Sequence, residues 1–344
     1  MIIDAMHTPA LPNDAQTPNH HPIQPMNGGT TALTDLGLIS ASGADAGTFL
    51  QGQLTQDVLS MTLGESRLAA FCNAKGRMQA SFWVVKRADN DYALVCSLDI
   101  LSQTLKRLGL FVMRAKVKLR DASADFSIWG LVGENTISIA SKAYKTPATD
   151  DIDHFLVHLR PAVGQARALW CAPNAEPPLG DALQPGLWAW LDVQAGIARV
   201  TLPIFEAFVP QMLNYESIGG VNFKKGCYPG QEVVARSQFR GTLKRRTYLV
   251  VGQHPAASEP MAVAQAVFHA LDAEQPCGMV AAWATNPFTQ NSTAGTAGDT
   301  HFAALVSMQT SAAQNAVSAH LTLGHPGGTV LTLQPLPYPL LEDI

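Results

Sequence analysis

The chain has 344 residues, of which 47% are hydrophobic and 15% charged, and its formal net charge is −4 at pH 7. This length suffices for two or three domains, and the slight acidity argues against general coating of nucleic acids. No apolar run reaches the roughly 18 residues of a membrane span, and we expect no membrane partner. Five widely spaced cysteines without a C-x-x-C pair predict no zinc ribbon or cysteine-ligated cluster, and a reducing cytoplasm is the simplest compartment.

The first part of the chain changes from a polar tail to a globular pattern. Residues 1–30 are rich in Pro, Asn, Gln and Gly and lack the basic and apolar regions of a secretory signal, so we expect a disordered tail. The spacing then predicts a strand, a cap and a helix over 36–54, and a hairpin over 67–85 with its turn at 73–76. Further strands are predicted at 92–98, 115–122, 126–133, 154–160 and 166–172, and helices at 99–113 and 177–197.

The last hundred residues have a different pattern. Short apolar runs separated by turn residues predict strands at 246–253, 262–270, 277–285, 302–309 and 316–323, and hence a small barrel or sandwich. We expect a mobile loop at 285–301. Because helices and strands mix without regular βαβ alternation, the fold class is α+β. The predicted division is a body at 31–246, with two lobes that split near 120–150, and a C-terminal domain at 247–344.

A basic segment surrounds one cysteine, Cys227. Between Asn222 and Arg246 there is one acid, Glu232, and there are seven basic residues: Lys224, Lys225, Arg236, Arg240, Lys244, Arg245 and Arg246. Gly226 and Gly230 bracket the cysteine, and a helix can begin directly after Gly230. The free N–H groups of that helix and the lysines would stabilise a thiolate or another anion. The alternative is a solvated surface turn.

The segment F-K-K-G-C-Y-P-G-Q-E-V-V-A-R resembles the K-G-C-Y-x-G-Q-E motif of the YgfZ-like folate-binding proteins, which are relatives of the glycine-cleavage aminomethyltransferase. Q-G-Q-L-T-Q-D at 51–57 and C-N-A-K-G-R-M at 72–78 also resemble segments of that family. The similarity extends over roughly 36–343. It implies a GcvT-like ring of three domains with a small C-terminal β-barrel, and tetrahydrofolate or a derivative in the central hole.

The resemblance also implies functional residues. Cys227 and Lys225 would be the catalytic pair at the mouth of the hole. Trp188 would line the folate pocket, and Gln194 stands where the family usually has a glutamate that contacts the pterin edge. Leu36 lies near the place of a second tryptophan of some members, so one stacking wall would be missing. Including the start of the helix after Gly230, the expected folate contacts are Trp188, Gln194, Tyr228, Gln231, Glu232 and Arg236. The ten histidines have no metal-ligand spacing, so no metal site is predicted.

Two polar clusters keep two interpretations each. Asn73, Lys75 and Arg77 form either a functional cluster or a solvated hairpin turn. Gln51, Thr55 and Asp57 either line the hole or cap and brace the first domain. Gln79 and Ala80 occupy the place of an aspartate pair in the aminomethyltransferases, and neither can be a carboxylate base, so ordinary aminomethyl transfer is not expected.

Three functions remain open. The first is a folate-dependent factor in iron–sulfur cluster assembly or repair, with client proteins or assembly factors as partners. The second is a one-carbon transferase that modifies tRNA or a protein, with the basic segment guiding the RNA. The third is a non-catalytic, folate-gated binding module. Cys227 would be a nucleophile, a partner in thiol exchange, or the holder of a cluster or a one-carbon adduct.

Overall fold

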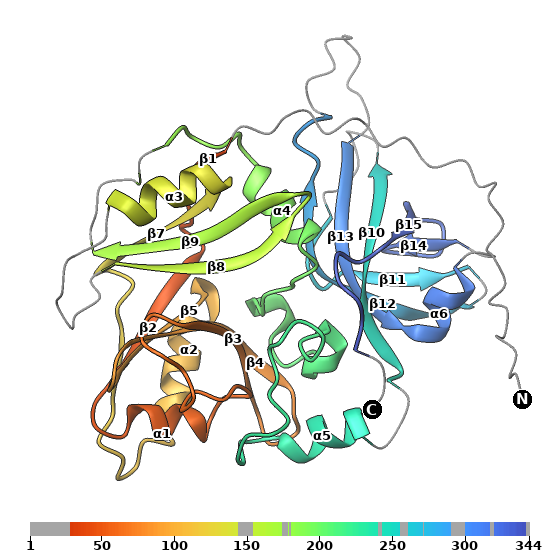
Figure 1. Ribbon diagram of the computed structural model, residues 1–344. Coiled ribbons are helices and arrows are strands. Elements are labelled where there is room, and N and C mark those ends of the chain that lie inside the picture. The colour runs from red at the N-terminus through yellow and green to blue at the C-terminus, as the bar shows by residue number, and fades with distance from the viewer. Residues whose placement is uncertain are drawn as a thin grey trace, which may run out of the picture.

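A computed structural model describes residues 28–143, 154–173, 178, 180–239, 243–254, 261–270, 272–289, 300–316 and 320–341. Nearly all of the expected tail, Arg240 and residues 290–299 of the expected loop lie outside these ranges. Two open sheets and a closed barrel lie around a central segment that runs from helix α4 to helix α5 (Figure 1). This mixed architecture with a C-terminal barrel confirms the predicted fold class.

The first sheet is antiparallel, with five strands in the order β3-β4-β5-β2-β6. Side chains of β2 alternate between two buried layers: Leu38 faces the second sheet, whereas Ile39 and Ala41 face the helices. This explains why the strand reads as a continuous apolar run. The elements are β2 (Leu36–Ser42), α1 (Ala46–Gln51), β3 (Ser66–Cys72), β4 (Met78–Ala88), β5 (Asp91–Ser97), α2 (Leu98–Gly109) and β6 (Lys118–Asp121).

The second sheet has the order β1-β7-β9-β8 and packs on the first through a shared apolar cluster. Its first strand, β1 (Gly29–Ala32), pairs Gly29 with Val132. The expected tail boundary at residue 30 was therefore too late, because β1 is too short to show a periodic pattern of its own. The other elements are β7 (Phe126–Val132), α3 (Glu134–Ala143), β8 (Phe155–Ala162) and β9 (Gln165–Pro173).

The barrel closes in the order β10-β13-β12-β11-β14-β15. Its strands are β10 (Arg245–His254), β11 (Ala266–His269), β12 (Asp272–Thr285), β13 (Thr300–Gln309), β14 (Leu321–Leu323) and β15 (Val330–Gln334). Of the strand predicted at 316–323, Leu321–Leu323 form β14, and residues 317–319 lie outside the described ranges. The short helix α6 (Thr310–Asn315) and β15 had no sequence prediction.

The central segment contains α4 (Leu187–Gln194), the 3₁₀ turns η1 (Leu202–Ile204) and η2 (Pro210–Leu213), and α5 (Gln231–Phe239). The helix predicted at 177–197 is wrong over 180–186, which the structure describes as non-helical. Pro185 disfavours helical backbone at the residue before it, and Gly186 has a left-handed φ of 79°, so the helix begins only at Leu187. In the ranges that the structure describes, no helix is long and apolar enough to cross a membrane.

Candidate functional site

The loop that carries Cys227 rests on the segment at 51–57. The backbone N–H of Asn222 donates to the carbonyl of Thr55 at 2.9 Å, and the Thr55 hydroxyl donates to the Gly220 carbonyl at 2.6 Å. The amide of Gln56 reaches the Gly219 carbonyl at 2.7 Å. Thr55 thus supports the bracing interpretation, since its side chain connects two motifs that lie about 165 residues apart.

Lys225 is buried and fixes this loop to the end of α1. Its ammonium donates to the carbonyl oxygens of Gln51 and, at 2.6 Å, of Leu54. It also lies 4.8 Å from the centre of the Tyr228 ring, which is a cation–π contact. Burial lowers the pKa of Lys225 to about 8, against the opposing attraction of Asp57 and Cys227. The ammonium of Lys225 therefore ties the Cys227 loop to the end of α1 and is already occupied by two carbonyl oxygens and the Tyr228 ring.

The start of α5 packs against the hairpin turn at 73–76. Gly230 has a φ of 79°, and a side chain there would lie 2.6 Å from the Cα of Gly76. The carboxamide oxygen of Asn73 accepts the N–H groups of Lys75 and Arg77 at 2.9 and 3.0 Å. The turn thus has its own hydrogen bonds and receives the backbone of Gly230. The three sequence motifs meet at this place.

Cys227 is exposed to solvent, whereas the other four cysteines are buried. Burial raises the pKa of the Cys72 and Cys96 thiols to about 12 and that of Cys171 higher still. Those thiols are kept protonated and covered. Cys227 is therefore the thiol of this chain that a solution partner can reach.

The predicted ligand residues around Cys227 have different environments. Tyr228 is buried, and burial raises the pKa of its hydroxyl. Gln231 is half-buried in the first turn of α5. Glu232 and Arg236 are exposed and pair with each other at 2.7 Å. The helix predicted after Gly230 is confirmed as α5.

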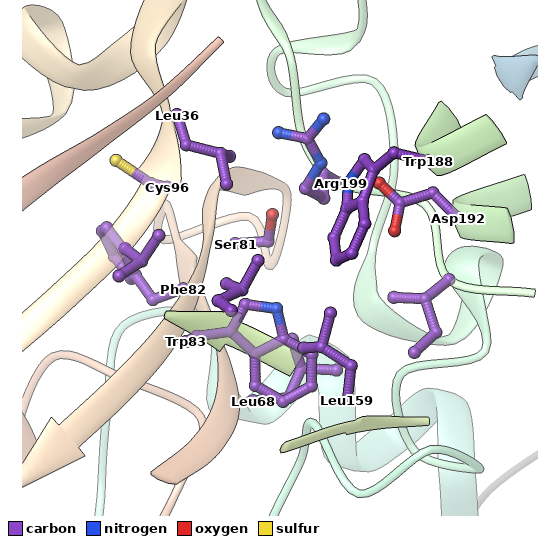
Figure 2. A pocket seen from close by; sticks show the side chains of 13 residues that line it. Leu36, Leu68, Ser81, Phe82, Trp83, Cys96, Leu159, Trp188, Asp192 and Arg199 are labelled. Carbon is purple, nitrogen blue, oxygen red and sulfur yellow. The ribbon is translucent and has the colours of Figure 1, made fainter. Parts of the chain in front are cut away.

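A cavity lies between the two sheets and α4 (Figure 2). Its volume of about 30 Å³ holds no more than one or two water molecules. The wall is mostly apolar, and its polar groups come from Ser81, Asp192 and Arg199. The lining residues are Leu36, Leu68, Ser81, Phe82, Trp83, Val95, Cys96, Leu159, Leu169, Trp188, Asp192, Ile197 and Arg199. No residue of the Cys227 loop is among them.

Two tryptophans extend into the cavity from different layers, Trp188 from α4 and Trp83 from β4 (Figure 2). The indole of Trp188 lies on the backbone of Gly130, where a side chain would come within 2.6 Å of its ring. The guanidinium of Arg167 lies 4.7 Å from the ring centre. Trp83 supplies a second aromatic wall. This wall was expected to be missing, because Leu36 lies near the place where some family members have a second tryptophan. The period-2 pattern of 78–85 places Trp83 and Ser81 on one face.

Asp192, and not Gln194, is the polar residue of α4 that lines the cavity. Residues four apart share a face of a helix, so Asp192 lies on the same face as Trp188. Gln194 is rotated about the helix axis by about 120° from Trp188. Asp192 pairs with the buried guanidinium of Arg167. Arg199 pairs with Asp35 at 2.7 Å. The cavity therefore has a carboxylate and a guanidinium in its wall, which the sequence interpretation did not single out.

A carboxylate also lies beside the position of the missing aspartates. The buried amide of Gln79 donates to Glu206 Oε1 at 2.6 Å. Glu206 has a left-handed φ of 57°, which is uncommon for a residue with a side chain. The other amide atom, Gln79 Oε1, is buried without a hydrogen-bond partner in the described structure. Glu206 follows 127 residues later in the chain, so no local motif could identify it.

The chain is similar to a known domain family and to a solved structure. A family model described as the GCVT N-terminal domain matches residues 25–169. The crystal structure of the glycine cleavage system aminomethyltransferase T from Bartonella henselae superposes with a TM-score of 0.61 and 16% identity, over 92% of this chain and 87% of that one. The fold is that of the glycine-cleavage aminomethyltransferases.

Sequence relatives are more specific. A protein of Photobacterium profundum, named tRNA-modifying protein YgfZ, is 32% identical over 64% of this chain and 69% of its own length. The tRNA-modifying protein YgfZ of Photorhabdus laumondii subsp. laumondii is 32% identical over 67% of this chain and 72% of its length. The chain belongs to the YgfZ family.

Proposed function

We propose that this protein binds tetrahydrofolate or a derivative of it between its two sheets and acts in tRNA modification and iron–sulfur cluster assembly or repair. The observation that carries the folate part is the cavity wall. A pterin needs aromatic faces, an acceptor for its N–H edge and a cation for its anionic tail. Trp188 and Trp83, Asp192, and Arg199 are of these chemical types.

The residues thus fit a folate chemically, but the cavity is too small for one. Binding therefore requires that α4 and the sheets separate, and the indole of Trp188 is the group to move. Bound folate would supply one-carbon chemistry. Asp192 would hold the pterin edge, and the tryptophans would exclude water from its faces.

The tRNA part rests on the names of the relatives, which are tRNA-modifying proteins. Cys227 is the proposed reactive group because it is exposed in the loop four residues before α5, three residues after the exposed Lys224. Lys225 is proposed to position it. Aminomethyl transfer of the glycine-cleavage type is not proposed, since Gln79 replaces the aspartate.

Binding of tetrahydrofolate can be measured by calorimetry and by quenching of tryptophan fluorescence. We expect Trp188→Ala and Asp192→Asn to weaken binding at least about tenfold, as each removes a stacking or charge-assisted contact. Gln194→Ala should bind as the wild type does. Because Asp192 also pairs with Arg167, Trp83→Phe is a second variant that leaves the ion pair intact. If Trp188→Ala and Trp83→Phe both bind tetrahydrofolate normally, the cavity is not the folate site.

The function of Cys227 can be tested in a strain that lacks the protein. Cys227→Ala should fail to restore the modified nucleoside content of tRNA and the activity of iron–sulfur enzymes, whereas Cys277→Ala should restore both. Full restoration by Cys227→Ala with intact folate binding would favour the non-catalytic module. Transfer of label from a labelled folate to RNA or protein would favour the one-carbon transferase.

A further inference from the structure

A second and larger hollow is lined by the later part of the central segment. It is a groove of about 780 Å³ between α5, the turn η2 and the adjacent ends of β10 and β13. In Figure 1, α5 lies below the barrel, near the lower end of β10. Its polar wall includes Arg236, Ser237, Lys244, Arg245, Gln211 and Gln309. A volume of this size is typical of small-ligand sites, which measure about 300–1,000 Å³.

The groove is positively charged in an acidic protein. Arg236, Lys244 and Arg245 line it, and no carboxylate does so among the described residues. Lys244 is exposed, and Arg245 is half-exposed with one donor on the Cys277 carbonyl at 3.3 Å. Arg236 pairs with Glu232, but that pair is exposed and weak. Two of the seven basic residues of the segment, Lys225 and Arg246, are buried and engaged elsewhere. The groove thus collects cations that are available to an anion.

One residue that lines the groove, Gln211, also has a side-chain acceptor without a donor in the described structure. Gln211 is fully buried, and its amide nitrogen donates to the Val234 carbonyl at 2.7 Å. That bond leaves the amide oxygen, Oε1, without a partner in the described structure. A buried acceptor without a donor costs about 1–3 kcal/mol. A phosphate cannot satisfy it, whereas a ribose hydroxyl or a nucleobase N–H can.

We propose that this groove binds a single-stranded segment of RNA, with phosphates on Arg236, Lys244 and Arg245 and a 2′-hydroxyl on Gln211 Oε1. Cations alone would accept any polyanion; the added acceptor selects a ligand that has both phosphates and hydroxyl donors. The inference rests on the proposed function in tRNA modification and gives it a location.

The place of the groove relative to Cys227 supports this assignment. Arg236 lies five residues after Gln231, or about 8 Å along the axis of α5. Cys227 precedes the same helix by four residues. The groove and Cys227 therefore flank the same short helix, the groove at its C-terminal half and the thiol before its first residue.

Fluorescence anisotropy with a labelled 12-nucleotide RNA, and with DNA of the same sequence, tests the proposal on the full chain. In the double variant Arg236→Gln/Lys244→Gln, affinity for the RNA should fall roughly tenfold, and the slope of log affinity against log salt should decrease by about 1.4, which is about 0.7 for each lost phosphate contact. Lys116→Gln/Lys118→Gln, which removes two exposed lysines at the start of the edge strand β6, outside the groove, is the matched control and should change neither. The wild type should prefer RNA to DNA by about fivefold, the equivalent of one net hydrogen bond.

Equal losses in the two double variants, or equal affinity for RNA and DNA, would overturn the proposal. Displacement of the RNA by a polyglutamate of the same charge at equal concentration would overturn it too, since it would make the groove a general anion site. Tetrahydrofolate binding is measured on the same samples. If the wild type binds RNA but no folate, only the proposal of a folate site is contradicted. An Arg236→Gln/Lys244→Gln variant that loses folate but keeps RNA contradicts the groove alone.

Discussion

The ammonium of Lys225 and the thiol of Cys227 are two residues apart and have opposite environments. The thiol is exposed, whereas the ammonium is buried against two carbonyl oxygens and an aromatic ring. Both the charged and the neutral amine can donate these hydrogen bonds, so burial acts mainly on the protonation of Lys225. Its folded-state pKa of about 8 lies below the ordinary value of 10.5.

This difference predicts how stability depends on pH. Between about pH 8 and 10.5 the unfolded chain binds more protons at Lys225 than the folded chain, so stability rises with pH through that window. Relative to Lys225→Met, the wild type should gain up to about 3 kcal/mol across it. Urea unfolding at a series of pH values measures the gap. A gap that stays flat across this window would contradict the prediction.

Gln79 and Glu206 define a second residue-scale prediction. The buried amide of Gln79 lies 2.6 Å from the carboxylate of the exposed Glu206, so a carboxylate at position 79 would be buried beside a like charge. Gln79→Asp should destabilise the protein by about 2 kcal/mol at neutral pH through like-charge repulsion. Adding Glu206→Gln should restore most of this loss, as should a lower pH. If the double variant is no more stable than Gln79→Asp, the two side chains do not interact as the structure shows.

At the scale of elements, three separate motifs meet at the start of α5. The segment at 51–57 holds the approach to Cys227, the end of α1 holds Lys225, and the hairpin turn at 73–76 receives Gly230. Each of these contacts has a backbone group as at least one of its partners. The motifs therefore support the Cys227 loop in one orientation.

A pair of glycines in the loop tests this support. Gly230→Ala introduces a side chain at a φ of 79° and 2.6 Å from Gly76, so it should cost at least about 2 kcal/mol and loosen α5 from the hairpin. Gly226→Ala has open space around it and should be nearly neutral. Urea unfolding gives the stability, and the alkylation rate of Cys227 reports the loop. Similar results for both glycines would show that the contact with the hairpin does not hold the loop.

The elements that the sequence predicted well are those whose pattern is local. The hairpin at 67–85, the helix at 99–113 and the start of α5 follow from apolar spacing and turn residues. The helix at 177–197 was too long, because its apolar content hid the break at Pro185 and Gly186. β1 and β15 are strands only because β7 and β10 offer them partners, which no local pattern shows.

The candidate sites divide in the same way. Trp188 was found through the family resemblance, and its neighbour Asp192 follows from helical geometry. Trp83, Arg199 and Glu206 come from segments far apart in sequence, and they are adjacent only after the sheets pack. The basic segment was visible in the sequence. Which of its residues are buried and which line the open groove depends on the packing of the chain, and a count of charges does not show this.

At the scale of the whole molecule, a buried polar network joins the barrel to the central segment. Arg246 in β10 pairs with Glu216 at 2.6 Å and also donates to the Leu341 carbonyl at 2.6 Å. Asn214 donates to the Thr247 carbonyl at 2.8 Å, and the Tyr338 hydroxyl donates to the Gly196 carbonyl at 2.7 Å. The groove proposed for RNA lies at this same junction, so its shape depends on the network.

Removal of Arg246 should therefore damage both stability and the groove. Arg246→Met leaves the carboxylate of Glu216 buried without its partner, which should cost about 3–5 kcal/mol. Burial already raises the pKa of Glu216, so the variant should regain stability at acid pH as that carboxylate takes up a proton. Urea unfolding at several pH values measures both effects, with Arg245→Met, a half-exposed neighbour, as the control at below about 1 kcal/mol. Glu216→Gln/Arg246→Met should be more stable than Arg246→Met alone, because no charge is left buried. A double variant that is weaker than Arg246→Met would mean that the arginine stabilises the junction through its contact with Leu341 and not through the ion pair.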